Sequence, residues 1–281
     1  MTTAVAAPFR FFALHVVRTR RLGPSLVRVS FAGEDLRHFF SDGRDQSLSL
    51  FLPHPGQDAP VVPVELGWGS SRSSAAESGG GWWQGWRELP DDVRAVMRSY
   101  TLREMRRDPD EIDVDFVLHT PAGPASAWAG RARAGDRVLL LGPAVADNRA
   151  IRFQPPDDTD LVLLRGDETA LPAIASILAS LPAGRRVRAW LEVRDARSAR
   201  HLATAADAEI SWLTDGTCLD VLRAAPLPPA ERPYAWIAGE SGSVKALRRH
   251  FVREWGIDRR RVTFVGYWRQ GMTEEQLRAA G

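Results

Sequence analysis

The sequence is poor in cysteine and has no long hydrophobic run. Cys218 is the one cysteine among 281 residues, which excludes an intrachain disulfide and a cluster held by several thiolates. No uninterrupted apolar stretch approaches the roughly 18 residues that a membrane span requires. The first residues, Met1–Pro8, lack the basic start and the apolar core of a secretory signal. We therefore expect a cytoplasmic protein without a membrane span.

The sequence also lacks an excess of charge of one sign and a metal-binding pattern of histidines. Its 37 Lys and Arg residues nearly balance 35 Asp and Glu residues, so no broad basic surface indicates nucleic-acid binding. The histidines show neither the close pair nor the mixed Cys/His spacing of a zinc or iron site; they are His15, His38, His54, His119, His201 and His250. We expect neither a nucleic-acid partner nor a resident metal.

The first half of the chain consists of short β-rich runs that are separated by glycine and proline. Such runs are typical of antiparallel strands, and six of them closed on themselves would leave no exposed sheet edge. The expected strands are Phe11–Arg20, Leu26–Phe31, Ser47–Leu52, Arg98–Arg103, Ile112–Leu118 and Arg137–Leu141, with a helical turn at Glu34–Phe40. The pattern predicts a six-stranded antiparallel β-barrel over residues 1–155.

Residues 56–90 interrupt this barrel. The stretch Gly67–Gly81 is a Gly/Ser linker with little apolar surface to bury, and we expect it to be mobile. Trp82, Trp83 and Trp86 follow it directly. These rings either dock the returning chain onto the barrel or form a lid over a bulky substrate or cofactor.

In the second half, strands alternate with helices, which indicates a parallel sheet covered on both faces. The expected strands are Leu161–Leu164, Val187–Val193, Ile210–Leu213, Tyr234–Ala238 and Val262–Tyr267. The expected helices are Thr169–Ser180, a helix around Ser198–Ala205, Leu219–Ala224 and Val244–Trp255. We place the boundary near Gln154–Asp160, so that residues 156–281 form an α/β domain of the nucleotide-binding type.

The stretch Arg98–Arg103 carries the first chemical signal. In a strand, Arg98, Tyr100 and Leu102 would share one face, while Ser99, Thr101 and Arg103 would share the other. A guanidinium beside an aromatic ring suits a flat, anionic cofactor such as a flavin dinucleotide, because the guanidinium takes a phosphate and the ring packs on the flavin or ribose. The alternative is an edge strand with two solvated arginines and a Tyr in the core.

A second signal follows the strand Ile112–Leu118. His119 opens a Gly/Pro turn that leads into a short helix, and the small residues Gly123, Ala125 and Ser126 would let backbone amides approach a pyrophosphate. His119 is either a hydrogen-bonded residue at a strand end or a contact to the flavin or substrate. The Asp113/Asp115 and Asp157/Asp158 pairs are expected to be solvated.

Six segments together resemble the siderophore-interacting proteins, which are FAD-containing ferric-siderophore reductases related to the ferredoxin reductases. The segments are Arg98-x-Tyr100-Thr101-x-Arg103, Asp115–His119, Gly123–Trp128, Gly166–Ala173, Ala238–Glu240 and Gly266–Arg269. They occur in order, and the resemblance extends from about residue 10 to residue 271.

The resemblance implies three sets of site residues. The FAD set is Arg98, Ser99, Tyr100, Thr101, Asp115, Val117, His119, Gly123, Pro124, Ala125, Ser126, Trp128, Tyr267 and Trp268. The NADPH set is Asp167, Glu168, Thr169, Ala238, Gly239 and Glu240, and the substrate contact is Arg269. In this reading Tyr267 and Trp268 shield the isoalloxazine; the alternative is that both rings pack the two domains together.

Three further positions follow from the residues themselves. Arg194 and Arg197 lie where the second strand of the parallel sheet ends, and they could pair with a ribose 2′-phosphate and so select NADPH over NADH. Lys245 lies in the first turn of a helix, where a cation opposes the helix dipole, which suggests a contact to an anionic iron chelate.

The resemblance implies a monomeric reductase that passes electrons from NAD(P)H through FAD to Fe(III) held by a siderophore, with iron as cargo. A flavin is the required adaptor because a nicotinamide delivers two electrons and iron accepts one. Three alternatives stay open at this point. They are ferredoxin as the electron donor, a general NAD(P)H:flavin reductase, and a non-catalytic protein that binds flavin or siderophore.

Overall fold

The computed structural model describes residues 8–63, 81–214, 218–273 and 276, and the chain divides into two compact units. Unit 1 contains residues up to Leu22 and from Leu26 to Ile151. Unit 2 contains Gly23–Ser25 and the chain from Arg152 onward. Most of the predicted Gly/Ser linker, residues 67–80, lies outside the described residues.

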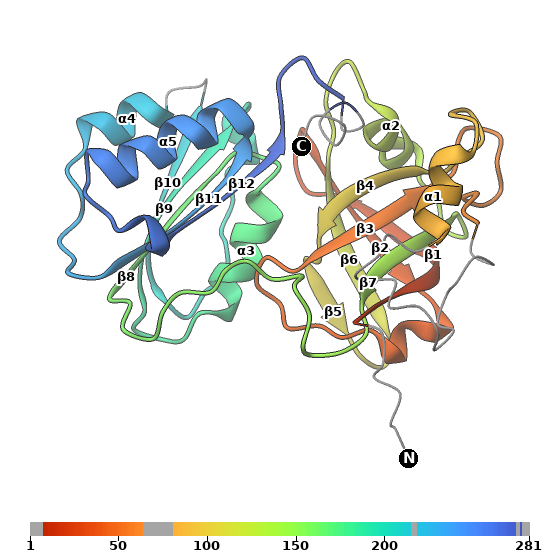
Figure 1. Ribbon diagram of the computed structural model, residues 1–281, viewed down its shortest axis with the longest axis horizontal. Coiled ribbons are helices and arrows are strands. Elements are labelled where there is room, and N and C mark those ends of the chain that lie inside the picture. The colour runs from red at the N-terminus through yellow and green to blue at the C-terminus, as the bar shows by residue number, and fades with distance from the viewer. Residues whose placement is uncertain (1–7, 64–80, 215–217, 274–275, 277–281) are drawn as a thin grey trace. The chain divides into compact units, whose positions relative to one another are not determined.

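Unit 1 is built on one antiparallel sheet, shown in Figure 1, with the strand order β4-β3-β7-β1-β2-β6-β5. Its strands are β1 (Phe9–Arg21), β2 (Leu26–Ala32), β3 (Ser47–Leu52), β4 (Val96–Thr101), β5 (Glu104–Arg106), β6 (Glu111–Val117) and β7 (Arg137–Pro143). The predicted count of six strands was wrong, because the described residues form seven. The additional strand, β5, has three residues, which is too short to show a period-2 pattern.

The sheet is curled, and the backbone after β4 connects its two ends. The Leu102 N–H donates to Gln46 O at 2.9 Å, beside β3, and the next residue, Arg103, donates its N–H to Asp113 O of β6 at 2.9 Å. Consecutive residues therefore contact opposite ends of the strand order. The architecture is a curled antiparallel sheet rather than the predicted closed barrel of six strands.

Alternating residues build the core of unit 1. On β6, Ile112, Val114 and Phe116 are fully buried inside the curled sheet together with Val29 and Phe31 of β2. Three helices of the described part accompany this sheet: the 3-10 helix η1 (Glu34–His38) at the predicted helical turn, α1 (Gly81–Glu88) and α2 (Pro124–Arg131).

The tryptophans after the linker lie on α1 and pack on the outer face of the sheet. The Trp82 ring meets Phe11 edge-on at 5.1 Å between centroids, and Trp86 meets Phe51 at 6.3 Å. Trp83 stacks on Trp86 at 5.2 Å. These contacts confirm that the rings dock the returning chain onto the sheet.

Acidic and basic side chains pair on the face of β6 opposite to Ile112, Val114 and Phe116. Asp115 accepts two hydrogen bonds from Arg28, at 2.7 and 2.9 Å, and Asp113 accepts two from Arg106, both at 2.8 Å. Both carboxylates are only 3% exposed. The prediction that Asp113 and Asp115 are solvated was therefore wrong, because arginines from β2 and β5 cover them.

Unit 2 contains a parallel sheet with the order β10-β9-β8-β11-β12 (Figure 1). Its strands are β8 (Leu161–Gly166), β9 (Arg186–Val193), β10 (Asp207–Thr214), β11 (Pro233–Glu240) and β12 (Val262–Trp268). Its helices are α3 (Leu171–Ser180), α4 (Cys218–Ala224), α5 (Ser241–Arg253) and the 3-10 helices η3 (Ala196–Ser198) and η4 (Arg259–Arg261). Gly166 faces α3 and its neighbour Arg165 contacts Cys218 of α4, so helices cover both faces of the sheet.

One predicted helix of unit 2 is absent. The segment around Ser198–Ala205 contains only the end of η3 and then runs without helical structure. Its side chains explain why: the Thr204 hydroxyl donates to Leu178 O at 2.7 Å and accepts from the Ala206 N–H at 3.1 Å. Leu202 is 7% exposed. The segment is therefore held against the end of α3, and the Thr204 hydroxyl makes these bonds where a helix would have backbone-to-backbone hydrogen bonds.

Among the described residues, no helix has the length and apolarity to span a bilayer. Likewise, no group of three or more His, Cys, Asp or Glu side chains in this part of the chain could hold a metal ion.

The buried carboxylate of Asp113 makes the stability of unit 1 sensitive to acid. Burial alone would raise the pKa of Asp113, but hydrogen bonds from Arg106 and Ser30 outweigh burial and lower it. Because the folded-state pKa lies below the unfolded value near pH 4, this contribution is present above about pH 4 and is lost at lower pH. We expect Asp113→Asn to lower the free energy of unfolding at pH 7 by roughly 3 kcal/mol and to flatten its acid dependence.

Thermal unfolding followed by calorimetry between neutral and acid pH tests this expectation. Asp110→Asn is the control, since Asp110 pairs with Arg107 at the surface, at 2.9 Å. This substitution should lower the free energy of unfolding by less than about 1 kcal/mol. Equal losses in the two variants would contradict the assignment.

Candidate functional site

The strand β4 presents Arg98 and Tyr100 on one face, as its alternation predicts. Tyr100 packs against the inner core of unit 1, whereas Met97 packs with the tryptophans of α1 on the outer face. Arg98 and Tyr100 are both half-buried, and β4 lies at one end of the strand order. The guanidinium and the ring therefore stand side by side on an end strand.

A column of rings fixes α2 relative to this pair. Tyr100 contacts Phe116 at 4.4 Å between centroids, and Phe116 contacts Trp128 of α2 at 5.7 Å. Trp128 also stacks on Phe31 at 6.3 Å with 9° between the planes. The rigid rings of this column hold α2 close to β4.

The turn before α2 is closed by its own side chains. The His119 N–H donates to the Ser126 hydroxyl at 3.2 Å, and the His119 ring bonds to Pro121 O at 2.9 Å. The first amides of a helix have no intrahelical partner, and Pro124 at the helix start leaves Ala125 and Ser126 to supply them. The Arg98 guanidinium and the first amides of α2 are groups of the kind that bind phosphate, and together they are the candidate cradle for the pyrophosphate of a dinucleotide.

The structure does not bring every predicted FAD residue to this cradle. Ser99 is exposed, and Thr101 is buried on the same side of β4, opposite to Tyr100. Asp115 lies on the face of β6 opposite to Phe116, where both carboxylate oxygens bond to Arg28. Val117 is half-buried where β6 ends.

In unit 2, Asp167 connects three segments that follow strands. Its Oδ1 accepts from the Thr169 N–H at 2.9 Å and from the Thr169 hydroxyl at 2.5 Å. Its Oδ2 accepts from the Glu240 N–H at 2.8 Å and from Trp268 Nε1 at 2.9 Å. The carboxylate thus has four donors, so Asp167 positions the carboxyl ends of β8, β11 and β12 rather than offering a free oxygen to a ligand.

Gly239 makes this arrangement possible. Its φ of +134° lies in a region that side chains disfavour, and a Cβ there would approach the Asp167 carboxylate carbon to 2.6 Å. Ala238 is fully buried in the strand before it, and Glu240 caps α5 by accepting from the Ser243 N–H at 2.7 Å.

Glu168 is a buried carboxylate with one oxygen left over. Its Oε1 accepts from the Ser25 hydroxyl at 2.7 Å and lies 3.3 Å from the Ser198 hydroxyl. Its Oε2 is buried without a hydrogen bond, with Arg194 Nε at 3.9 Å. The sequence pattern missed Ser25 and Ser198, since neither belongs to a recognisable motif. An unpaired carboxylate oxygen at the end of β8 suits a ribose hydroxyl.

The two arginines after β9 differ in their surroundings. Arg194 is 58% exposed beside Glu168. Arg197 is 79% exposed and binds Asp195 at 2.6 Å, which lowers the pKa of the Asp195 carboxyl through the hydrogen bond from the Arg197 side chain. Both cations therefore lie after one strand end, and Arg197 already has a carboxylate partner.

Lys245, the single lysine of the sequence, lines a basic groove of about 530 Å³ on α5. The other lining residues are Arg248, Arg249, Val252, Arg253, Arg259 and Phe264. Arg248 stacks on Phe264 at 4.3 Å from the ring centroid, and Phe264 is 44% exposed. No carboxylate is among these described lining residues, so the groove attracts anions.

The remaining predicted residues follow or end β12. Trp268 is held by its bond to Asp167, and Tyr267 meets Trp236 edge-on at 6.4 Å. Arg269 is exposed just after the strand. Cys218 is 1% exposed and burial raises the pKa of its thiol, which makes it an unreactive residue of the core.

The contact between Gly239 and Asp167 gives a sharp prediction. Gly239→Ala should destabilise unit 2 by at least about 2 kcal/mol, because backbone strain and a clash with the carboxylate act together. Gly256→Ala is the matched control: Gly256 also has positive φ, at +70°, but a Cβ there meets nothing within 4 Å. Thermal unfolding should show the larger loss for Gly239→Ala, and equal losses would argue against the clash.

Comparison with known proteins agrees with this geometry. The family model of the siderophore-interacting FAD-binding domain matches residues 15–147, and that of the siderophore-interacting protein matches residues 159–271. An NADPH-dependent ferric-chelate reductase of Escherichia coli is 32% identical over 92% of this chain and 93% of its own length. The ferric vibriobactin reductase of Vibrio cholerae is 29% identical over 93% of this chain and 90% of its own.

A solved structure is similar over almost the whole chain. The crystal structure of a siderophore utilization protein from T. fusca has a TM-score of 0.74 and 30% identity, covering 96% of each chain. The chain therefore belongs to the siderophore-interacting protein family.

Proposed function

We propose that this protein is an FAD-dependent reductase of ferric siderophores that takes its electrons from NADPH. The observation that carries the proposal is the pairing of Arg98 and Tyr100 on one face of β4, which contacts α2. The relatives named as ferric vibriobactin reductase and NADPH-dependent ferric-chelate reductase support the choice of substrate and electron donor.

In this proposal unit 1 holds FAD. Tyr100 supplies a half-buried ring for the isoalloxazine or ribityl chain, and its contact with Phe116 keeps that ring from moving. Arg98 and the amides of Ala125 and Ser126 hold the pyrophosphate, because charge-assisted and backbone hydrogen bonds both favour its negative charge. The His119–Ser126 bond keeps the turn in shape.

Unit 2 holds NADPH at the carboxyl ends of its strands. Asp167 keeps the turns after β8 and β11 at a fixed separation, and Gly239 lets the backbone come close. Glu168 offers its unpaired oxygen to a ribose hydroxyl, and Arg194 offers its exposed guanidinium to a 2′-phosphate. Arg197 contributes less, since Asp195 already neutralises it.

The basic groove of α5 supports an anionic chelate as the substrate. Five cations line it, from Lys245 to Arg259, together with the exposed ring of Phe264. When bound, FAD supplies the adaptor between a two-electron donor and the one-electron acceptor Fe(III). Hard oxygen ligands hold Fe(II) more weakly than Fe(III), so reduction releases the metal. Ferredoxin as the donor, the monomeric state and the cytoplasmic location stay predictions.

Removal of the cradle tests the FAD assignment. Arg98→Ala and Tyr100→Ala should each weaken FAD binding by roughly 10-fold or more, because each loses a phosphate or ring contact. Ser99→Ala is the control, since this exposed residue lies on the other face of β4 and should leave the flavin content unchanged. Folded Arg98→Ala and Tyr100→Ala proteins that keep a full complement of tightly bound FAD would refute the proposal.

Turnover separates the reductase from its alternatives. We expect the purified protein to be yellow, to bleach when NADPH is added without oxygen, and to regain colour on addition of a ferric siderophore. Bleaching followed by loss of FAD on dialysis would indicate a general flavin reductase instead. A protein that binds flavin but does not bleach with NADPH would be a carrier, or would need another donor such as a reduced ferredoxin.

A further inference from the structure

We propose that the outer edge of β12 and the basic groove of α5 together bind an acidic, extended segment of a partner protein, which adds a strand to the sheet of unit 2. The helix α5 and the strand β12 pack together (Figure 1), and residues of both line the groove of about 530 Å³. A groove of this volume is within the usual range of ligand sites. The inference goes beyond the proposed function, and its test requires no turnover.

The strand β12 has an unprotected outer edge. It ends the strand order, and the backbone of residues 263–266 forms hydrogen bonds to no described segment other than β11. Its sequence, VTFVGYW, contains neither a charged residue nor a proline, which natural proteins use to keep further strands away from an edge. Its seven residues have the length of an ordinary strand. The edge can therefore accept an added strand.

Phe264 gives this edge an apolar contact beside an unsatisfied donor. Its side chain is 44% exposed, more than any other large hydrophobic residue of the described chain. Arg248 lies over the Phe264 ring at 4.3 Å from the centroid, and Arg248 Nε is buried without a hydrogen bond to a described residue. A buried donor without an acceptor is unfavourable, so a ligand that brings both carboxylates and apolar side chains suits this position.

The groove carries charge of one sign. Its cations are Lys245, Arg248, Arg249, Arg253 and Arg259. None of them forms an ion pair with a described residue, because the nearby carboxylates already have other partners: Glu254 bonds to His250 at 2.8 Å, and Asp258 bonds to Arg260 at 2.7 Å. The positive charge of the groove is therefore available to a ligand.

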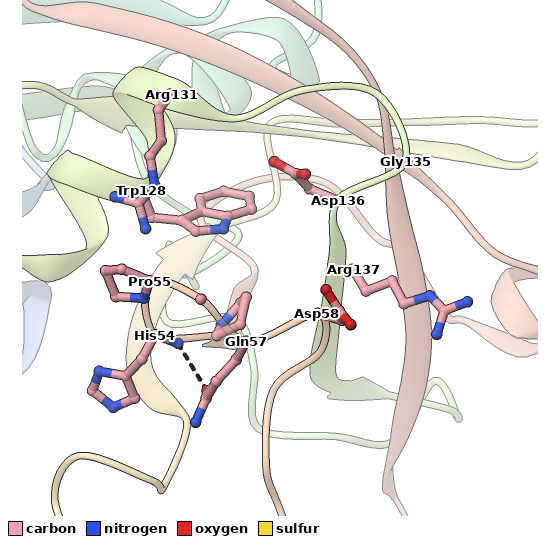
Figure 2. A pocket seen from close by; sticks show the side chains of 11 residues that line it. His54, Pro55, Gln57, Asp58, Trp128, Arg131, Gly135, Asp136 and Arg137 are labelled. Carbon is pink, nitrogen blue, oxygen red and sulfur yellow. Dashed lines mark hydrogen bonds between the residues drawn. The ribbon is translucent and has the colours of Figure 1, made fainter.

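A hollow in unit 1 shows the contrast. Its volume is about 440 Å³, and its walls are the loop 53–58 after β3, the end of α2 and residues 135–137 (Figure 2). The carboxylates of Asp58 and Asp136 accompany Arg131 and Arg137 in its lining, so that opposite charges compensate one another. The described lining of the α5 groove has no such compensation, and it therefore favours an anionic partner.

The spacing of the cations suits an extended strand. Lys245, Arg249 and Arg253 recur every four residues on α5, which corresponds to about 6 Å along a helix axis. Alternate side chains of a strand recur about every 7 Å on one face. Since α5 packs along β11 and β12, an added strand with acidic residues at alternate positions would meet these three cations in turn.

The same charges disfavour a second copy of this chain as the occupant. Two β12 edges that paired about a two-fold axis would put both α5 helices on the same face of the joined sheet, with their unpaired cations near one another. Like charges that face each other across an interface oppose association. A strand that carries carboxylates brings attraction without this repulsion, so the occupant is an acidic partner.

Synthetic peptides test the assignment on the full chain as purified. The first peptide has seven residues, the length of β12, and alternates Glu with Val; the second has Lys in place of Glu. The third is the Glu peptide with a central proline, which cannot complete the backbone ladder. Calorimetry at low and high salt measures their binding, and hydrogen exchange of residues 263–266 reports the added strand.

The proteins compared are the wild type, the triple variant Lys245→Ala/Arg249→Ala/Arg253→Ala and the single variant Arg260→Ala. Arg260 is the matched control, because its guanidinium is 83% exposed and does not line the groove. We expect the Glu peptide to bind the wild type, more weakly at high salt. The triple variant should bind it roughly tenfold more weakly or less, since each surface ion pair contributes about two- to fivefold, whereas Arg260→Ala should stay within about twofold.

The Lys peptide should not bind, the proline peptide should bind roughly tenfold more weakly, and residues 263–266 should exchange more slowly with the Glu peptide. Equal binding of the Glu and proline peptides, or unchanged exchange, would overturn the added strand. A wild type that does not bind the Glu peptide at low salt would overturn the inference. Loss of ferric-chelate binding or of anionic-phospholipid vesicle binding in the triple variant would then assign the groove to a chelate or to a membrane surface instead.

Discussion

The contact of Tyr100, Phe116 and Trp128 is the packing on which the candidate cofactor site depends. The three rings come from β4, β6 and α2, and their centroids are separated by 4.4 and 5.7 Å. Because protein cores are close-packed and aromatic rings are stiff, this column sets the distance between the strand and the helix. At one end of the column Tyr100 presents a half-buried side chain beside Arg98, and at the other end Trp128 stacks on Phe31. The proposed flavin site and α2 are thus spaced by one hydrophobic contact.

In unit 2, a carboxylate fixes the positions of the strand ends, as the aromatic rings fix β4 and α2 in unit 1. The carboxylate of Asp167 accepts four hydrogen bonds, from Thr169, Glu240 and Trp268. Thr169 follows β8, Glu240 ends β11 and Trp268 ends β12, so one side chain fixes three pieces of backbone. This arrangement also requires glycine at position 239, because the Cβ of any larger residue would occupy the space of the Asp167 carboxylate.

Sequence reasoning found every described strand except the three-residue β5, the order of the two units and the Arg98–Tyr100 face, because local alternation and turn residues carry that information. It failed where the outcome depended on partners distant in sequence. The alternation in Glu111–Val117 predicts a strand with one apolar face, but it does not show that Arg28 and Arg106 bury Asp115 and Asp113 on the other. Likewise, the residues after Ser198 have helical propensity, and the bond from Thr204 to Leu178 O overrides it.

Whether a polar group already has a hydrogen-bond partner within the chain distinguishes structural residues from candidate ligand-binding residues. Asp115 and Asp167 both lie in the predicted site segments, but all of their oxygens already have donors within the chain. Glu168 Oε2 is buried without a hydrogen bond among the described residues, and Lys245 lines a groove whose described lining holds no carboxylate. Since a buried unpaired group is unfavourable in the free protein, it persists where binding restores the missing bond. By this physical criterion Glu168 Oε2, just after β8, and the basic groove of α5 are candidate ligand contacts among the described residues.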